Sequence, residues 1–236
     1  MTNTFSSLDQ ILFVVFPYLV MFIFFVGTIM RYRKAPFTYS SLSSQFLENE
    51  QHFWGVVPFH YGIIVVLTGH VVAFLVPREI LLWNSHPLRL YILEVSALIF
   101  GLLALVGLVG AMLRRMTVSK VREVTSPLDW IVLAVLLVQV ASGIYVAVFH
   151  PWGSSWFAAA AAPYLWSLVK FRPELGYIAL MPLAVKLHIL MAYVVIGIAP
   201  FTRLVHILVV PNPYLWRKPQ VVRWYGHRVP ALGRRA

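Results

Sequence analysis

Four histidines lie inside long apolar stretches of this 236-residue chain, where an ionisable side chain is costly. His60 and His70 enclose the apolar run of "FHYGIIVVLTGH", and His188 and His206 lie in the last apolar stretch. Neutral imidazole is a frequent ligand of haem iron and of other transition metals. The first hypothesis is therefore that these side chains bind a metal cofactor within a membrane.

The spacing of the four histidines predicts two pairs. In regular helices, the step from His60 to His70 spans about 15 Å and a rotation of roughly 80°, whereas the step from His188 to His206 spans about 27 Å on one face. If the two helices run antiparallel, His60 lies level with His206, and His70 lies level with His188. Two facing imidazoles are the ligand set of a six-coordinate b-type haem. The pattern therefore predicts two haems, one above the other.

Two alternatives to haem ligation need no cofactor. The histidines could form hydrogen bonds between helices, as polar side chains in membrane bundles do. They could also relay protons in a transporter or channel, but the sequence shows no inverted repeat and suggests no buried carboxylate. The remaining histidines fall at the ends of apolar stretches or in loops and tails, where solvated side chains are expected: His52, His86, His150 and His227.

Basic and small residues near the four histidines could contribute to a haem pocket. Arg203 lies one turn before His206, and Lys186 lies two residues before His188, so either could neutralise a haem propionate or extend to the lipid headgroups. Three glycines could let a flat macrocycle approach the backbone or could serve close helix packing: Gly62, Gly69 and Gly197.

The composition predicts that the elements holding these residues are membrane helices. Of the residues, 60% are hydrophobic and only 11% are charged, with a mean hydropathy of +0.80. Five stretches are long enough to cross a hydrocarbon core of about 30 Å. We expect them near residues 11–30, 53–76, 90–113, 128–149 and 178–210. The last is too long for one plain span, and Pro200 predicts a bend in it. The fold class is therefore an all-α integral membrane bundle of five transmembrane helices, a single domain over residues 1–236.

Basic clusters predict the orientation of the bundle. "RYRK", "RRMTVSKVR" and "WRKPQVVRWYGHR" follow the first, third and fifth stretches, which places these loops in the cytoplasm, with the N-terminus outside (periplasmic) and the C-terminus cytoplasmic. The net charge of +11 fits such loops, or docking to an acidic partner, better than nucleic acid. The outer loop, residues 150–177, favours a short interfacial helix or a disordered connection. The first stretch lacks the features of a cleaved signal peptide and is expected to be retained.

The chain contains no cysteine. Iron–sulfur clusters and thiolate metal sites need cysteine ligands, and c-type haem needs C-x-x-C-H for its covalent attachment. These centres are therefore excluded from this chain.

Several motifs resemble one known family. They include "PFHYGIIVVLTGH", "KLHILMAYVVIGIAPFTRLVHILVVPNPYLWRKPQVVR", the N-terminal "YLVMFIFFVGTIMRYR", "SSQFL" and "SKVREVTSPLDWIVL". The resemblance covers most of the chain and is densest around the paired histidines. The sequence is similar to the gamma subunit of respiratory nitrate reductase, a cytochrome b of the cytoplasmic membrane of bacteria or archaea.

The resemblance implies two haem b groups and a quinol site. His60 and His206 would bind the proximal haem, near an iron–sulfur beta subunit, and His70 and His188 the distal haem, beside a quinol pocket at the outer surface. That pocket would include Gly69, His70 and a basic residue at the start of the third stretch. The lysine of the family is absent there, and Arg89 is the nearest substitute, with His86 as a second candidate.

The resemblance also implies a respiratory reaction shared between subunits. Quinol would pass electrons to the distal haem and release its protons outside, and the proximal haem would pass the electrons to the iron–sulfur subunit. Nitrate itself would be reduced on a molybdenum-containing alpha subunit. Related dihaem cytochromes serve reductases of chlorine, selenium or sulfur compounds, and this alternative stays open at the level of the sequence.

Overall fold

The computed structural model describes residues 7–39, 44, 47 and 50–208, and these contain helices and no strand. The main helices are α2 (Phe16–Lys34), α3 (Glu50–Leu75), α5 (Pro87–Thr117), α7 (Pro127–Phe149) and α11 (Leu183–Ile198). A short helix, α1 (Ser7–Gln10), and a π-helical turn, η1 (Ile11–Val15), continue directly into α2. The basic C-terminal tail and most of "SSQFL" lie outside the described residues.

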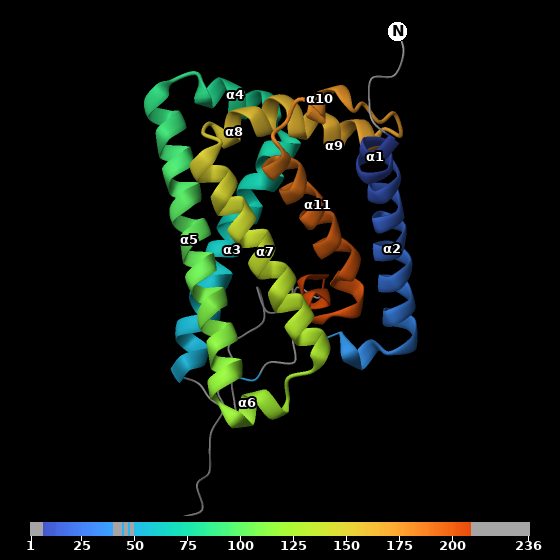
Figure 1. Cartoon of the computed structure of the whole chain (residues 1–236), viewed down its shortest axis with the longest axis vertical. Coiled ribbons are helices and arrows are strands. Elements are labelled where there is room, and N and C mark those ends of the chain that lie inside the picture. Colours follow the sequence, from blue (N-terminus) through green and yellow to red (C-terminus); the bar gives the residue numbers. More distant parts are fainter. Residues whose placement is uncertain (1–6, 40–43, 45–46, 48–49, 209–236) are drawn as a thin grey trace, which may run out of the picture.

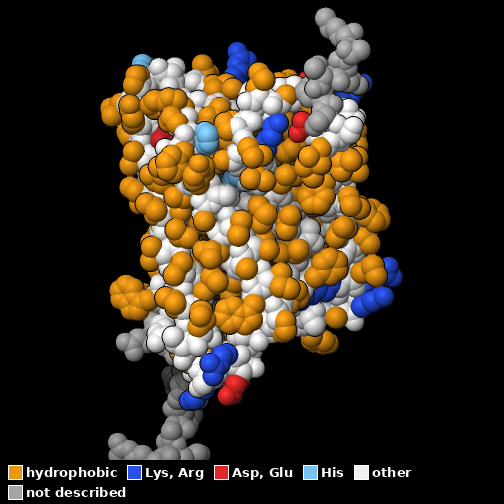
Figure 2. Space-filling view, viewed as in Figure 1, with side chains coloured by type: hydrophobic (Ala, Val, Ile, Leu, Met, Phe, Trp, Pro, Cys, Tyr) orange, Lys and Arg blue, Asp and Glu red, His pale blue; other side chains and the backbone are white. Residues whose placement is uncertain are grey.

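The five predicted membrane helices are confirmed as apolar helices of sufficient length. The candidate spans are Ser7–Lys34, Phe53–Leu75, Pro87–Thr117, Pro127–Phe149 and Leu183–Phe201. Figure 1 shows them side by side, with α3 and α7 running opposite to α2, α5 and α11. In Figure 2, hydrophobic side chains cover the band between the two ends, and charged side chains gather towards those ends. The chain is therefore a multi-pass membrane protein.

The two ends of the bundle differ in structure. One end, called here the α6 end, carries η2 (Pro36–Thr38) and α6 (Ser119–Glu123). At the other, the α9 end, α4 (Pro77–Asn84), α8 (Gly153–Trp156), η3 (Phe157–Ala161), α9 (Ala162–Val169) and α10 (Gly176–Ala179) lie across the bundle (Figure 1). The helix expected within residues 150–177 is confirmed, because residues 153–169 are helical throughout.

The last membrane segment differs from the continuous helix on which the 27 Å spacing was based. α11 begins at Leu183 and ends at Ile198, and two 3₁₀ turns follow, η4 (Ala199–Phe201) and η5 (Arg203–Leu208). Pro200 lies in the first of these turns, as the predicted bend requires, since proline cannot donate a helical hydrogen bond. His188 and His206 therefore do not share one face of a single helix.

Glycines allow α3 and α5 to pack closely. A Cβ atom at Gly62 would lie 2.5 Å from the backbone nitrogen of Ala104, and one at Gly107 would lie 2.3 Å from that of Phe59. Small residues at such crossings let two backbones approach each other. Of the two roles considered for Gly62, the structure therefore favours helix packing, and Gly62 faces α5.

Buried tyrosines fasten the transverse helices to the bundle. The Tyr164 hydroxyl donates to the Phe13 carbonyl over 2.7 Å, and the Tyr193 hydroxyl donates to the Tyr164 oxygen over 3.2 Å. Burial raises the pKa of Tyr164, so its hydroxyl remains protonated and can donate. Trp166 of α9 stacks on Phe74 of α3 and donates its ring N–H to the Phe74 carbonyl over 2.8 Å. These contacts hold α9 against η1, α11 and the end of α3.

Candidate functional site: two pairs of histidines

His60 and His206 come together towards the α6 end. Their ring centroids are 6.3 Å apart, and the ring planes make an angle of 58°. Bonds between a metal and an imidazole nitrogen are about 2 Å long, so two imidazoles that share one metal ion have centroids roughly 6 Å apart. The predicted pairing of these two residues in space is confirmed, and its dimensions are compatible with one metal ion between the rings.

Backbone carbonyls fix the proton on one ring nitrogen in three of the four histidines. A carbonyl oxygen only accepts hydrogen bonds, so the Nδ1 beside it must carry the proton and donate. The Nε2 atom is then unprotonated, which is the state that binds a metal. These bonds run from Nδ1 of His60 to Val56 (2.8 Å), of His70 to Val66 (2.8 Å) and of His206 to Arg203 (2.5 Å).

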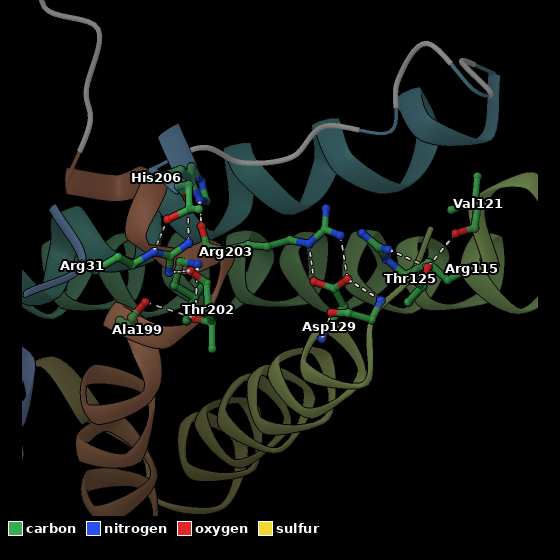
Figure 3. A network of polar contacts seen from close by, with 12 residues as sticks. Arg31, Arg115, Val121, Thr125, Asp129, Ala199, Thr202, Arg203 and His206 are labelled. Carbon is green, nitrogen blue, oxygen red and sulfur yellow. Dashed lines mark hydrogen bonds and ion pairs between the residues drawn. The ribbon is translucent and has the colours of Figure 1, made fainter. Parts of the chain in front are cut away.

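The residues around Pro200 hold His206 in place. Arg31, in the last turn of α2, donates through Nη1 to the carbonyls of Pro200 and Thr202, each over 2.8 Å. Figure 3 shows these contacts beside His206. Because one guanidinium nitrogen joins the carbonyls of Pro200 and Thr202 to α2, the arginine stabilises the bend. The bend in turn presents His206 to α3.

Arg203 is held by a buried carboxylate that the sequence analysis missed. Asp129, in the first turn of α7, is 5% exposed, and it accepts two hydrogen bonds from Arg203, one of them 2.6 Å from Nη2 (Figure 3). Ser126 and Asp129 also form a reciprocal capping box at the start of α7. The serine three residues before an acidic residue was the available signal. The expectation of no buried carboxylate was wrong.

His70 and His188 form the second level, towards the α9 end. His70 is exposed on α3, and the edge of its ring meets Phe157 of η3 with centroids 5.3 Å apart. His188 is partly buried on α11 and is close enough to His70 for an electrostatic interaction. The two side chains are thus in the same part of the bundle, and His70 is the more open of them. Their pairing across one metal ion stays a prediction.

One face of α7 surrounds the His188 ring. The Ser142 hydroxyl lies 2.9 Å from His188 Nδ1, and the Gln139 side-chain nitrogen lies 3.5 Å from His188 Nε2. A Cβ atom at Gly143 would lie 2.9 Å from His188 Cε1, so a larger residue there would require the ring to shift. None of these residues was predicted as part of the site, although two polar side chains in the apolar run "VLLVQVASGIY" were a signal.

The residues proposed for a quinol pocket are only partly assembled. Gly69 stands beside His70 and has open space where a Cβ would lie. Arg89 is exposed at the start of α5, with its guanidinium 5.2 Å from the Trp83 ring centroid, and His86 is the exposed N-cap residue of the same helix. Arg89 therefore contacts Trp83, and its role in binding quinol stays a prediction.

The two basic residues proposed to neutralise haem propionates are already paired with carboxylates of this chain. Lys186 forms an ion pair with Asp9 over 3.6 Å. Arg203 pairs with Asp129, as described above. A propionate would have to share these cations with carboxylates of the chain, so propionate binding stays a prediction for both.

A further acidic residue lies within a membrane segment. Glu94 of α5 accepts hydrogen bonds from the backbone N–H and the hydroxyl of Ser154, over 2.8 and 2.5 Å. Asn84 donates to the hydroxyls of Ser154 and Ser155, both over 2.9 Å. This network joins α4, α5 and α8 at the α9 end, so Glu94 has a structural role in positioning the transverse helices.

Each histidine pair offers two imidazole ligands, which suits a metal whose other ligands come from a cofactor. Within the part of the chain that the structure describes, no group of three or more histidine, aspartate or glutamate side chains could hold a bare metal ion. Two imidazoles leave four positions of an octahedral metal to another ligand, and a porphyrin supplies four in a plane. The histidine pairs therefore fit haem iron better than a free cation.

Comparison with known proteins identifies the family. A family model described as "Nitrate reductase gamma subunit" matches residues 9–225. The nitrate reductase gamma chain of Bacillus subtilis (strain 168) is 35% identical over 218 residues, covering 91% of this chain and 97% of the relative. The respiratory nitrate reductase 2 and 1 gamma chains of Escherichia coli (strain K12) are 31% and 28% identical, covering 89% and 92% of this chain and 94% and 97% of those relatives. The chain thus belongs to the nitrate reductase gamma subunit family, the membrane subunits of respiratory nitrate reductase.

Proposed function

We propose that the chain is the quinol-oxidising dihaem cytochrome b of a respiratory nitrate reductase. His60 and His206 would hold one haem b, and His70 and His188 would hold a second. The observation that carries this proposal is the His60–His206 pair, with centroids 6.3 Å apart and both Nδ1 atoms donating to carbonyls. When bound, the haems supply one-electron carriers at two depths in the membrane.

The side chains of this protein act by binding and orienting. Each Nδ1 donor bond fixes the direction of a ring and leaves Nε2 free for iron. The apolar helices exclude water around both levels, and a low dielectric strengthens the hydrogen bonds that orient the ligands. The Asp129–Arg203 ion pair places a hydrogen-bonded cation one turn from His206, where propionate charge would need neutralisation.

We place the quinol site at the α9 end. The open space beside Gly69 and the exposure of His70 support access from the lipid. Arg89, with His86 as the second candidate, is the basic group that would bind an oxygen of the quinol ring. The α9 end would then face outside and receive the protons. Each electron that moves inward while its proton stays outside stores about 2.3 kcal/mol per 100 mV of membrane potential.

The α6 end then faces the cytoplasm and the partner subunits. Its described residues include several basic side chains, of which Arg114 is buried against Ser44: Arg31, Arg33, Lys34, Arg114, Arg115, Lys120 and Arg122. Such clusters mark cytoplasmic ends of membrane helices. We propose that an iron–sulfur beta subunit docks here, beside the His60–His206 level, and delivers electrons to a molybdenum-containing alpha subunit where nitrate is reduced.

Single histidine substitutions in the complete complex test the proposal. His60→Ala and His206→Ala should remove the same haem from the visible spectrum, and His70→Ala and His188→Ala should both remove the other. His150→Ala, outside both pairs, should keep two haems. His70→Ala should also abolish quinol oxidation, and quinol-driven haem reduction that survived this change would contradict the placement of the quinol site.

A further inference from the structure

His188 differs from the other three membrane histidines in the partner of its Nδ1 atom. His60, His70 and His206 donate to backbone carbonyls, which no substitution removes. The Nδ1 of His188 lies 2.9 Å from the hydroxyl of Ser142, a side chain on another helix, and the imidazole also interacts with the backbone of Gln139. One of the four proposed iron ligands is therefore oriented in part by a group that mutation can delete.

The bonds of Ser142 determine the direction of this contact. Its hydroxyl donates its single proton to the carbonyl of Gln139, over 2.9 Å, one turn earlier on α7. A serine hydroxyl has one proton and two lone pairs, so it is left to accept from His188. Nδ1 of His188 is then the protonated nitrogen, and Nε2 is the free one, as in the other three histidines.

Gly143 and Gln139 complete the environment of the ring. Gly143 admits the ring against α7, since a Cβ there would lie 2.9 Å from Cε1. Gln139 approaches Nε2 at 3.5 Å, and its buried Oε1 has no hydrogen-bond partner. Iron needs the Nε2 atom, so the Gln139 contact is one that haem binding would replace. The Ser142 contact is on the opposite nitrogen and is compatible with a bound metal.

We propose that Ser142 is a positioning residue for His188, and this inference rests on the proposed function. Its hydroxyl accepts the Nδ1 proton, fixes the ring and increases the basicity of Nε2. A more basic axial ligand favours ferric over ferrous iron, because second-shell acceptors donate electron density through the imidazole. Ser142 therefore lowers the reduction potential of the distal haem and leaves that of the proximal haem unchanged.

The alternative role of Ser142 is to join α7 to α11 by a hydrogen bond without influencing iron. Ser96 of α5 offers a matched control for it. The Ser96 hydroxyl also donates to a carbonyl three residues earlier, that of Leu93 over 3.0 Å. Ser96→Ala thus removes a similar bond from a similar membrane helix and leaves the hydrogen bonds of the proposed ligands in place.

The test is a potentiometric titration of both b haems in the purified complex, carrying Ser142→Ala, Ser142→Thr or Ser96→Ala. In Ser142→Ala, one haem should become easier to reduce, with its reduction equilibrium constant raised about five- to tenfold. The other haem should titrate as in the unsubstituted protein. Threonine keeps the hydroxyl and should restore the original potential, and Ser96→Ala should change neither haem.

Each outcome of this titration distinguishes the inference from the proposed function. Two haems that both titrate normally in Ser142→Ala would overturn the inference, as would an equal shift in Ser142→Thr. Loss of the distal haem in the alanine variant but not in the threonine variant would support it, whereas loss in both would overturn it. An unsubstituted complex without two haems in this chain would instead contradict the proposed function.

Discussion

Asp129 binds the guanidinium of Arg203, while the backbone carbonyl of this arginine accepts the Nδ1 proton of His206. The carboxylate on α7 is thereby connected to the histidine that follows the broken end of α11. A buried residue far from His206 in the chain thus contributes to the orientation of the ring.

Removing the charge of Asp129 should destabilise this end of the bundle. Asp129→Asn leaves Arg203 partly buried with a weaker partner, and breaking a buried ion pair costs about 3 kcal/mol or more. We expect a lower Tm in detergent and selective loss of the haem at the His60–His206 level. Asp9→Asn, which alters a more exposed pair at the α9 end, should cost about 1 kcal/mol or less. Equal effects of the two substitutions would contradict this account.

The periodic and compositional features of the fold could be predicted from the sequence, because they depend on local hydrophobicity. The five spans and the bend at Pro200 follow from residue types and spacing alone. The antiparallel order of the spans placed His60 level with His206, although the assumed regular helix before His206 was wrong. The two 3₁₀ turns, the second of which contains His206, could not be predicted, since Arg31 of another helix stabilises them. Which side chains surround His188 depends on how α7 packs against α11. The hydrophobic pattern of one helix does not show which other helix lies beside it.

Enlarging Gly143 should displace the distal ligand. In Gly143→Ala the new methyl group would lie 2.9 Å from His188 Cε1, so the ring must shift away from Ser142. We expect less distal haem per chain, measured from the visible spectrum, with the proximal haem retained. Gly101→Ala is the control, because its methyl group would make an ordinary 3.6 Å contact with Ile144. A full complement of distal haem in Gly143→Ala would show that the His188 ring does not need the space beside Gly143.

Gly62 and Gly69 should respond differently to the same change. A methyl group at Gly62 would lie 2.5 Å from the backbone of Ala104, so Gly62→Ala should separate α3 from α5 and lower the Tm. A methyl group at Gly69 meets no atom within 4 Å, so Gly69→Ala should leave Tm and haem content unchanged. It should nevertheless slow quinol oxidation, because the methyl group would occupy the proposed pocket. Normal quinol kinetics in Gly69→Ala would argue against a pocket on this side of His70.

Arg89 should matter for quinol and not for haem. Arg89→Gln removes a charged hydrogen-bond donor, which should lower kcat/KM for quinol at least about tenfold while both haems remain. The measurement is quinol-dependent nitrate reduction by the complete complex, with haem spectra recorded on the same sample. Arg78→Gln, an exposed arginine on α4 at the same end, is the matched control. If Arg78→Gln were the impaired variant, Arg89 would not be the quinol-binding residue.

The central claim is that this chain holds two haems between its paired histidines, and haem content tests it most directly. The complete complex would be purified from membranes, its non-covalent b haem measured per gamma chain by the pyridine haemochrome, and its reduction by quinol followed in the visible spectrum. This account predicts two b haems per gamma chain, both reduced by quinol. A folded, assembled complex with no haem, or with a single haem, in this subunit would contradict it.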